Sequence, residues 1–532
     1  MRRANHFTGV AAGLLLLGGA ALAQTGASSY ERTLLAIQEQ IQNRNFAAAE
    51  ALATQAERAF PANGGIENLK GVIAIQQGRA EEAERDFVAA VRHSPRLASA
   101  YLNLGRLYRE NPGHDRDAEA KALRAYEKAL TIAPENAEAN YNVAGLLMHT
   151  GKYERSLEHR SKLSQEEQQS VGMLVVACAD EAALGHKVDL ERHAEALAAQ
   201  ADLAEADVIE AVPALRTARR ADLIETLLSA AAAHQSLSAA GLRMLGLAEE
   251  AMGQLPRAQD ALERAFAADS ASVATLSDLA RVAEERKDLK GALGYLAHAR
   301  DLEPRNAEYS YQFGLICAKM SLLSEAHKAL EEAVQMNPEN PDYNYAMGVV
   351  TDSAKGPNDA LPYLEKFHAL RPADAKGILA LGTTSYRAKD FDAASKWLKQ
   401  AETHVETAAA AHFYLGRIAR QRGQFDEAQD ELVQADKLGP NQPEVLAETG
   451  QLYLQQKKYP DAEKALDRAA ALDPESYAAN FGLLQLYART GDPRREEQSK
   501  RFDAIKAKNE EQYRETLRVL EIRPDGAKPD QP

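Results

Sequence analysis

The sequence predicts an all-α protein built from a series of similar helical hairpins. Small residues recur every 34 residues, turn-forming residues lie between them, and only 6% of the residues are aromatic. A chain of 532 residues is too long for one hydrophobic core, so it must form several domains or a repeat array. Few aromatic side chains suit closely packed helices better than β-sandwiches.

The 34-residue period is clearest when Ala239 is taken as position 1 of a unit. Position 8 holds Gly246, Ala280, Gly314, Gly348, Gly382, Gly416 and Gly450, and position 20 holds Ala258, Ala292, Ala326, Ala360, Ala394, Ala428 and Ala462. Position 32 holds Pro304, Pro338, Pro372, Pro440 and Pro474, with Glu406 in the slot between Pro372 and Pro440. Small residues let two helices approach closely, and a proline ends the second helix. A single hairpin cannot bury its apolar stripe alone, so neighbouring hairpins are expected to stack.

These units resemble tetratricopeptide repeats. The best copies are Leu104, Gly105, Tyr108, Ala122, Tyr126, Ala129 and Pro134, and Leu415, Gly416, Phe425, Ala428, Leu432, Ala435 and Pro440. Unit starts from Tyr30 to Tyr477 predict about fourteen hairpins. The resemblance implies a right-handed superhelical solenoid, in which one face of each first helix lines an inner groove.

The repeats are predicted to occupy residues 30–493, with a weaker pattern over 137–238 and an insertion at 111–115. Pro213 falls inside an expected helix, which it should start or kink. Residues 494–521 are predicted to form a charged helix that caps the array or, alternatively, docks a partner as a coiled-coil arm. Its apolar residues are Phe502, Ile505, Tyr513, Leu517 and Leu520. Residues 522–532 are predicted to be disordered.

The N-terminus has the pattern of a secretory signal. Arg2 and Arg3 precede an apolar stretch, and Ala21-Leu22-Ala23 resembles a cleavage site. We expect residues 1–23 to be removed, residues 24–29 to be a short linker, and the protein to be periplasmic or extracellular. The alternative is an uncleaved anchor, but the stretch is shorter than the ~20 residues that span a bilayer. No integral membrane segment is expected after cleavage.

The charge and the cysteines narrow the function further. The net charge of −15 disfavours binding to nucleic acid and to anionic lipid. Cys178 occupies a small-residue position of the repeat, so it is expected to be a packing residue. A disulfide between Cys178 and Cys317 is not expected.

The sequence predicts no catalytic residues, no metal site and no cofactor. It has no H-E-x-x-H, C-x-x-C, G-x-x-x-x-G-K-[ST] or G-x-S-x-G motif. His186 and His193 straddle an expected turn and are interpreted as solvated histidines. His114 and Asp115 are interpreted as part of a polar turn, because the segment lacks the pattern of an EF-hand loop.

Residues at positions 2, 5, 9, 12 and 13 share the face opposite the packed face of the first helix. The resemblance implies that this face lines the groove, and Arg and Tyr, which are frequent in binding hot spots, collect there. The predicted partner-binding residues are Asn103, Arg106, Arg109, Tyr141, Asn142, Arg281, Tyr311, Tyr345, Tyr386, Arg387, Phe413, Arg417 and Arg420. Alternatively, the aromatic residues only pack between neighbouring units.

The sequence therefore predicts a non-catalytic scaffold that binds protein or peptide partners, acidic ones in particular, in its groove. The chaperone-tail clamp of the family is not expected, because no unit has Lys at position 5. The alternative function is a carbohydrate-handling subunit, such as a polysaccharide export or secretion scaffold, with groove aromatics stacked on sugars. The identity of the partner and the oligomeric state stay open.

Overall fold

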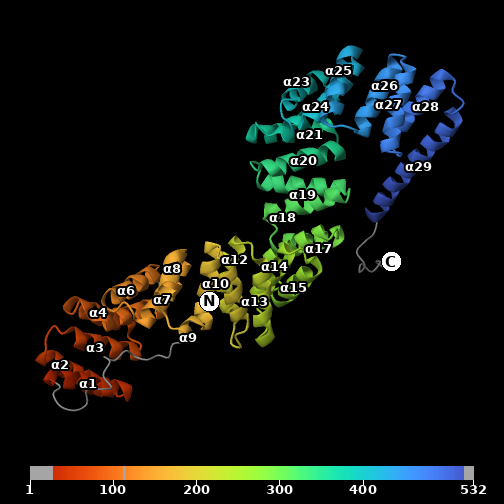
Figure 1. Cartoon of the computed structure of the whole chain (residues 1–532). Helices are drawn as coiled ribbons and strands as arrows, with labels where there is room; N and C mark the ends of the chain where they lie inside the picture. The colour runs from red at the N-terminus through yellow and green to blue at the C-terminus, as the bar shows by residue number, and fades with distance from the viewer. Residues whose placement is uncertain (1–27, 112–115, 521–532) are drawn as a thin grey trace, which may run out of the picture. The chain divides into compact units, whose positions relative to one another are not determined.

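The structure is a computed structural model that describes residues 28–111 and 116–520, with side chains up to residue 508. The expected signal sequence, most of the linker, residues 112–115 of the insertion and the C-terminal tail lie outside these residues. The described residues form 29 α-helices and no strand, as the fold class predicted (Figure 1). No helix among them is long and apolar enough to cross a membrane.

The helices pair into fourteen successive hairpins. In unit 1, residues 1–270, the helices are α1 (Ser29–Gln42), α2 (Phe46–Ala59), α3 (Gly64–Gln76), α4 (Ala80–His93), α5 (Ala98–Glu110), α6 (Ala118–Ile132), α7 (Ala137–His149), α8 (Tyr153–Arg160), α9 (Gln165–Gln168), α10 (Val171–Leu184), α11 (Lys187–Ala198), α12 (Glu205–Thr217), α13 (Ala221–His234), α14 (Ala239–Ala251) and α15 (Leu255–Ala268).

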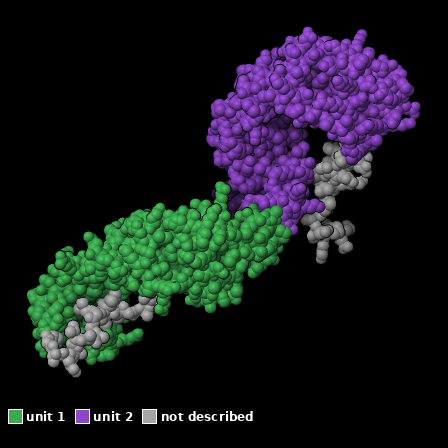
Figure 2. All heavy atoms as spheres, in the orientation of Figure 1, with its two compact units in different colours: residues 1–270 green, residues 271–532 purple. Residues whose placement is uncertain are grey.

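Unit 2 comprises residues 271–532 (Figure 2). It continues the alternation of first and second helices. Its helices are α16 (Val273–Glu285), α17 (Leu289–Leu302), α18 (Ala307–Lys319), α19 (Leu323–Met336), α20 (Pro341–Ala354), α21 (Pro357–Leu370), α22 (Ala375–Arg387), α23 (Phe391–Ala401), α24 (Ala408–Gln421), α25 (Phe425–Leu438), α26 (Pro443–Gln455), α27 (Tyr459–Leu472), α28 (Tyr477–Thr490) and α29 (Arg495–Leu520).

The glycines at position 8 set the distance between the two helices of a hairpin. A Cβ atom on Gly382 would lie 2.8 Å from Leu398 of the second helix, and one on Gly450 would lie 2.5 Å from Leu466. Gly246, Gly314, Gly348 and Gly416 face a leucine in the same way. The small-residue column of the sequence is therefore a column of close helix contacts.

Outside the α5–α6 turn, which is not fully described, each hairpin turn contains one residue with a positive φ. Gly78, Gly253 and Gly423 have φ between 73° and 76° at position 15 of their units. Lys287 and Lys389 have φ near 63° at the same position, although a side chain disfavours this conformation. The turn geometry is thus common to the units, while the residue that adopts it varies.

The weak stretch of the sequence keeps the period but alters the helices. Units begin at Ala137, Val171 and Glu205, as the 34-residue spacing predicts. However, α8 has only eight residues, and the four-residue helix α9 follows it. The first helix of the next unit, α10, is buried around most of its circumference because α7, α8, α11 and α12 all pack against it.

Of the two alternatives expected for Pro213, a helix start or a kink, the first is wrong. Helix α12 begins at Glu205 and continues through Pro213 to Thr217. The pyrrolidine ring is exposed, while Val208, Val212 and Leu215 on other sides of the helix are buried. The burial of these side chains offsets the lost backbone hydrogen bond at Pro213.

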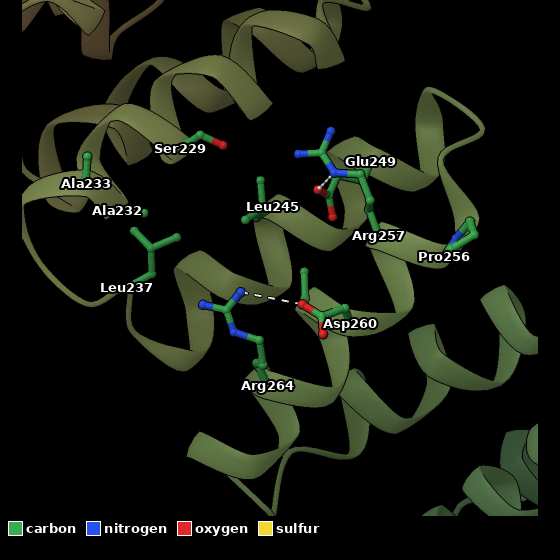
Figure 3. A pocket seen from close by; sticks show the side chains of 11 residues that line it. Ser229, Ala232, Ala233, Leu237, Leu245, Glu249, Pro256, Arg257, Asp260 and Arg264 are labelled. Carbon is green, nitrogen blue, oxygen red and sulfur yellow. Dashed lines mark ion pairs between the residues drawn. The ribbon is translucent and has the colours of Figure 1, made fainter.

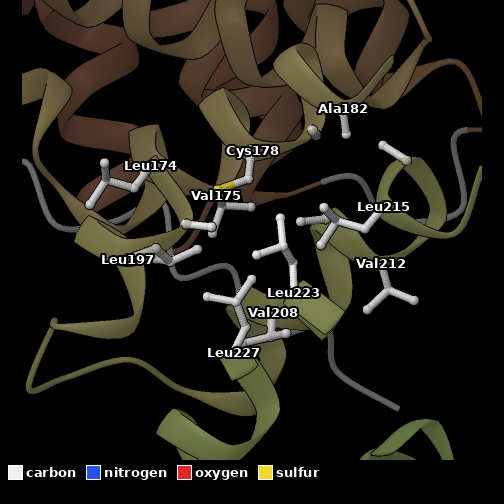
Figure 4. Close-up of a cluster of buried hydrophobic side chains, with 14 of the residues drawn as sticks. Leu174, Val175, Cys178, Ala182, Leu197, Val208, Val212, Leu215, Leu223 and Leu227 are labelled. Atoms are coloured by element: carbon white, nitrogen blue, oxygen red, sulfur yellow. The ribbon is translucent and has the colours of Figure 1, made fainter. Parts of the chain in front are cut away.

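Both cysteines are free and buried, as their places in the repeat predicted. Cys178 of α10 lies in a cluster with Leu174, Val208 and Leu227 (Figure 4). Cys317 of α18 is buried in unit 2. Burial raises the pKa of both thiols to about 12.

The long helix α29 packs its N-terminal half on α28. Phe502 is 8% exposed and its ring centroid lies 4.8 Å from that of Tyr477 and 5.5 Å from that of Phe481. Gln498 is buried and donates to the backbone and side-chain oxygens of Asn480. The side chains expected to continue this stripe, from Tyr513 onwards, lie outside the described residues. This half of α29 therefore acts as the second helix of the last hairpin.

Candidate partner-binding surface

Some of the predicted partner-binding residues gather in two clusters on first helices, one in each unit. In unit 2, Arg417 of α24 lies among the rings of Tyr386, Phe413 and Tyr414. Its guanidinium carbon is 5.1, 5.5 and 5.9 Å from their respective centroids. The side chain of Arg417 is 32% exposed, so solvent still reaches it between the rings.

Glu448 of α26 joins Arg417 and Arg420 from the next hairpin. One carboxylate oxygen is 2.5 Å from Nε of Arg420, and the other is 3.5 Å from Nε of Arg417. Two guanidinium groups therefore share one carboxylate, which leaves one positive charge in excess. We call Tyr386, Phe413, Tyr414, Arg417, Arg420 and Glu448 the Arg417 cluster.

The other predicted residues of unit 2 lie apart from this cluster. Arg387 pairs with Asp352, and Arg281 pairs with Asp278 at 2.9 Å. Tyr311 contacts the ring of Tyr343 at 4.8 Å between centroids. Tyr345 contacts the ring of Phe367 at 5.0 Å. The aromatic residues thus pack against neighbouring elements, and the arginines do not form one continuous cationic strip.

In unit 1 the predicted residues form a polar network between the first helices α3, α5 and α7. Asn103 donates to Asn68 at 2.9 Å, and Arg109 donates to Asn142. Arg106 binds both carboxylate oxygens of Glu138, at 2.5 and 2.6 Å. A bidentate pair of this kind fixes one helix against the next.

Four of the predicted residues are more buried than a groove position implies. Asn103, Tyr141, Asn142 and Tyr386 have 6–9% of their surface exposed. Burial raises the pKa of Tyr386, and Gln421 donates to its hydroxyl oxygen at 2.7 Å. These side chains hold neighbouring repeats together, and direct contact with a partner stays a prediction for them.

The acidic partners of the arginines were missed in the sequence. Asp278 and Glu448 occupy position 6 of their units, the position that holds Asn103 and Asn142 elsewhere. The sequence did contain a signal for these pairs. Asp278 at position 6 lies three residues before Arg281 at position 9, on the same side of one helix. Glu448 at position 6 faces Arg417 and Arg420, at positions 9 and 12 of the preceding unit.

The interpretation of His193 as a solvated histidine is wrong. His193 is 9% exposed, and its Nδ1 lies 3.8 Å from Glu181, which is also bound by Arg160 at 2.8 Å and by His186 at 2.8 Å. The two histidines also do not straddle the turn, because His186 lies in it and His193 lies inside α11. Both side chains point towards Glu181 on α10. Burial and the nearby Arg160 lower the pKa of His193.

Next to Glu181 on α10, Asp180 is fully buried. Ser156 is 2.8 Å from its carboxylate and 2.9 Å from the carbonyl of Ala144. A serine hydroxyl has one hydrogen and cannot donate to both. A protonated Asp180 resolves the conflict by donating to Ser156, and burial raises the pKa of Asp180 to about 7.

An open pocket of about 600 Å³ lies in unit 1 between α13, α14 and α15. Glu249 faces Arg257 at 3.1 Å on one side, and Asp260 lies 3.6 Å from Arg264 (Figure 3). Ser229 and small apolar residues of α13 line the opposite side. The charges pair with one another, so the pocket has no net preference for an ion of one sign.

Stacked helical hairpins with close contacts at small residues define a helical-repeat protein. The comparison with family models identifies which family of helical repeats it is. The tetratricopeptide repeat model matches residues 34–95, 68–129, 116–159, 243–308, 379–443 and 448–498, together more than half of the chain. The chain belongs to the tetratricopeptide repeat family. Repeats of this family serve as scaffolds for protein interactions, and no enzyme family is indicated.

Solved structures with similar folds share little sequence with this chain. The APC/C hetero-tetramer Cut9–Hcn1 is 14% identical with a TM-score of 0.37, covering 86% of this chain and 96% of that chain. PilF of Pseudomonas aeruginosa is 23% identical with a TM-score of 0.34, covering 39% and 94%. A tetratricopeptide repeat protein of Parabacteroides merdae is 14% identical with a TM-score of 0.40, covering 47% and 98%. No curated protein matches the sequence.

Proposed function

We propose that this protein is a non-catalytic scaffold outside the cytoplasm that binds a protein partner at the Arg417 cluster. The observation that carries the proposal is a partly exposed arginine among three aromatic rings on first helices of consecutive hairpins. Arg and Tyr dominate binding hot spots because they combine apolar area with directed polar contacts. The signal-like N-terminus supports the extracytoplasmic location.

The chemistry of the cluster favours an acidic peptide segment. The excess positive charge attracts a carboxylate, and the rings of Phe413 and Tyr414 offer apolar surface beside it. Glu448 competes for the same guanidinium groups, so an acidic ligand must replace part of an existing ion pair. Binding should therefore weaken as the salt concentration rises.

The test is a single substitution, Arg417→Gln, in the mature protein. Reversing both arginines would leave the buried Glu448 unpaired, which destabilises a protein for reasons unrelated to binding. Arg417→Gln retains the Arg420–Glu448 pair, so the fold should keep its melting temperature. Affinity for a partner recovered from an envelope fraction should fall by about 2 kcal/mol, as at a hot spot.

The matched control is Arg468→Gln on the second helix α27. Arg468 hydrogen-bonds to Asn441 away from the Arg417 cluster, and its loss should leave affinity unchanged. Equal affinity of Arg417→Gln and wild type would place the binding surface elsewhere. N-terminal sequencing of the exported protein tests the location separately, with Gln24 as the expected first residue.

A carbohydrate-handling role is the second candidate, supported by two exposed rings on α28. Tyr477 and Phe481 are 49% and 38% exposed, and their planes differ by 21°. Exposed, nearly parallel rings can stack on the faces of sugar units. Loss of oligosaccharide binding on Tyr477→Ala, with protein binding unchanged, would support this role.

A further inference from the structure

Three ligand-type side chains meet in unit 2 where the sequence predicted no metal site. Glu402 follows the end of α23, His412 lies in the first turns of α24, and Glu431 lies in the middle of α25. One donor atom from each lies within 4.8 Å of the others, and Nδ1 of His412 is 2.6 Å from Glu431. All three side chains are half-buried.

The unit that carries Glu402 departs from the repeat at this point. Helix α23 has eleven residues, and Glu406 stands where most units have the terminal proline. The chain instead forms an additional turn over 402–407, where the Thr407 hydroxyl donates to the Ala401 carbonyl at 2.6 Å. The buried Thr407 anchors this turn between α23 and α24.

The same three repeat positions carry acids once more, in unit 1. Glu57, Glu67 and Asp86 have the spacing of Glu402, His412 and Glu431. There the chain supplies its own cation: Nζ of Lys70 lies 3.1 Å from Glu57 and 3.9 Å from Asp86.

In unit 2 the position of Lys70 is taken by Leu415, which is buried. Within the described part of the chain, the Glu402 carboxylate has no hydrogen bond or ion pair, and Glu431 pairs only with His412. Two carboxylates therefore converge where the corresponding site of unit 1 holds an ammonium group. This comparison points to a cation supplied from outside the chain.

We propose that Glu402, His412 and Glu431 bind one divalent transition-metal ion, with Zn²⁺ as the ion that fits best. Zn²⁺ accepts imidazole nitrogen and carboxylate oxygen together and tolerates a fourth position filled by water. Its charge replaces the missing ammonium group. Because Glu402 directly follows α23 while His412 and Glu431 lie on α24 and α25, the ion would connect two successive hairpins at the turn that lacks proline.

The test is calorimetric titration of the untagged mature protein with Zn²⁺, repeated with Co²⁺, whose visible spectrum reports ligand geometry. The variants are Glu402→Gln, which removes a charge from a side chain without a partner, and His412→Ala. The control is Asp430→Asn, which removes an equal charge from the exposed neighbour of Glu431 on α25. Melting curves with and without Zn²⁺ show that each variant is folded.

The wild type and Asp430→Asn should bind one ion at this site and melt at a higher temperature with Zn²⁺ present. Glu402→Gln and His412→Ala should each weaken that binding at least tenfold and lose the gain in melting temperature. Absence of Zn²⁺ binding to the wild type overturns the proposal. Binding that both variants retain at wild-type affinity also overturns it, since the ion is then held by other surface residues. Partner binding is not used as a readout, so failure here leaves the proposed function untouched.

Discussion

At the scale of single residues, the glycines differ sharply in what surrounds them. A Cβ atom on Gly382 would lie 2.8 Å from Leu398, whereas one on Gly294 of α17 would have no atom within 4 Å. Both residues lie inside helices, where alanine is favoured over glycine by about 1 kcal/mol. The local environment therefore decides whether a Gly→Ala substitution stabilises or destabilises the protein.

We predict opposite effects of Gly382→Ala and Gly294→Ala on the free energy of unfolding. Gly382→Ala should destabilise unit 2 by about 1–3 kcal/mol through overpacking, and Gly294→Ala should stabilise it by up to about 1 kcal/mol. Urea titrations followed by circular dichroism measure both changes. Equal shifts in the same direction would show that position 8 does not control helix spacing.

A second residue-scale prediction concerns Asp180, whose pKa is raised to about 7 from an ordinary value of 3.8. The folded protein then binds a proton more tightly than the unfolded chain. The stability from this proton is complete below pH 4 and is lost as the pH rises through 7. The isosteric variant Asp180→Asn has no such loss. The free energy of unfolding of the variant minus that of the wild type should therefore rise by up to about 4 kcal/mol between pH 4 and pH 8.

The measurement is the difference between wild type and Asp180→Asn in chemical unfolding at several pH values. His193 has a lowered pKa, so its contribution makes stability rise with pH, opposite to the contribution of Asp180. This contribution is present in both proteins, and taking the difference removes it. A difference that does not vary with pH would mean that Asp180 stays ionised.

The sequence predicted on which helices the candidate site residues lie better than it predicted which side chains they contact. The period placed Arg417, Arg420 and Tyr386 on first helices, where the structure has them. It did not predict that Glu448 bridges two arginines or that His193 turns back to Glu181. Such contacts depend on which residues of neighbouring units face each other, and a single-helix pattern does not contain that information.

At the scale of elements, the helices follow the sequence most closely where the period is strong. Unit starts at Ala137, Val171 and Glu205 follow from the spacing alone. The short α8 and the extra helix α9 do not, because α10 is apolar on nearly every side and its neighbours rearrange to cover it. Tertiary burial also carries α12 through Pro213, against the local preference of proline.

The element-scale prediction concerns α29. Phe502→Ala should destabilise the last hairpin by about 3 kcal/mol, because the ring is buried against Tyr477 and Phe481. Leu438→Ala on α25 is the control, since that side chain is 51% exposed and should change stability by less than about 0.5 kcal/mol. Hydrogen exchange should accelerate in α28 and α29 alone. Unchanged exchange there would show that α29 does not cap the array.

At the scale of the whole molecule, the fold class follows from the sequence because a similar helical hairpin recurs fourteen times in the described residues. A wrong prediction for one unit, such as the helix start expected at Pro213, does not affect the predictions for the other units. The contacts run between neighbouring helices along the chain, so each stretch depends mainly on its own neighbours. The right-handed superhelix that the family implies depends on small rotations per unit, which residue columns do not specify.

The two buried cysteines give each unit its own internal reporter of opening. Cys178 lies in unit 1 and Cys317 in unit 2, and with pKa values of about 12 both thiols are protonated at neutral pH. Thiol reagents attack the thiolate, so labelling requires the surrounding helices to open. Leu174→Ala, next to Cys178, should accelerate labelling of Cys178 and leave Cys317 at its wild-type rate. Mass spectrometry of the labelled peptides measures both rates in one sample, and equal acceleration would show that the two halves of the chain open together.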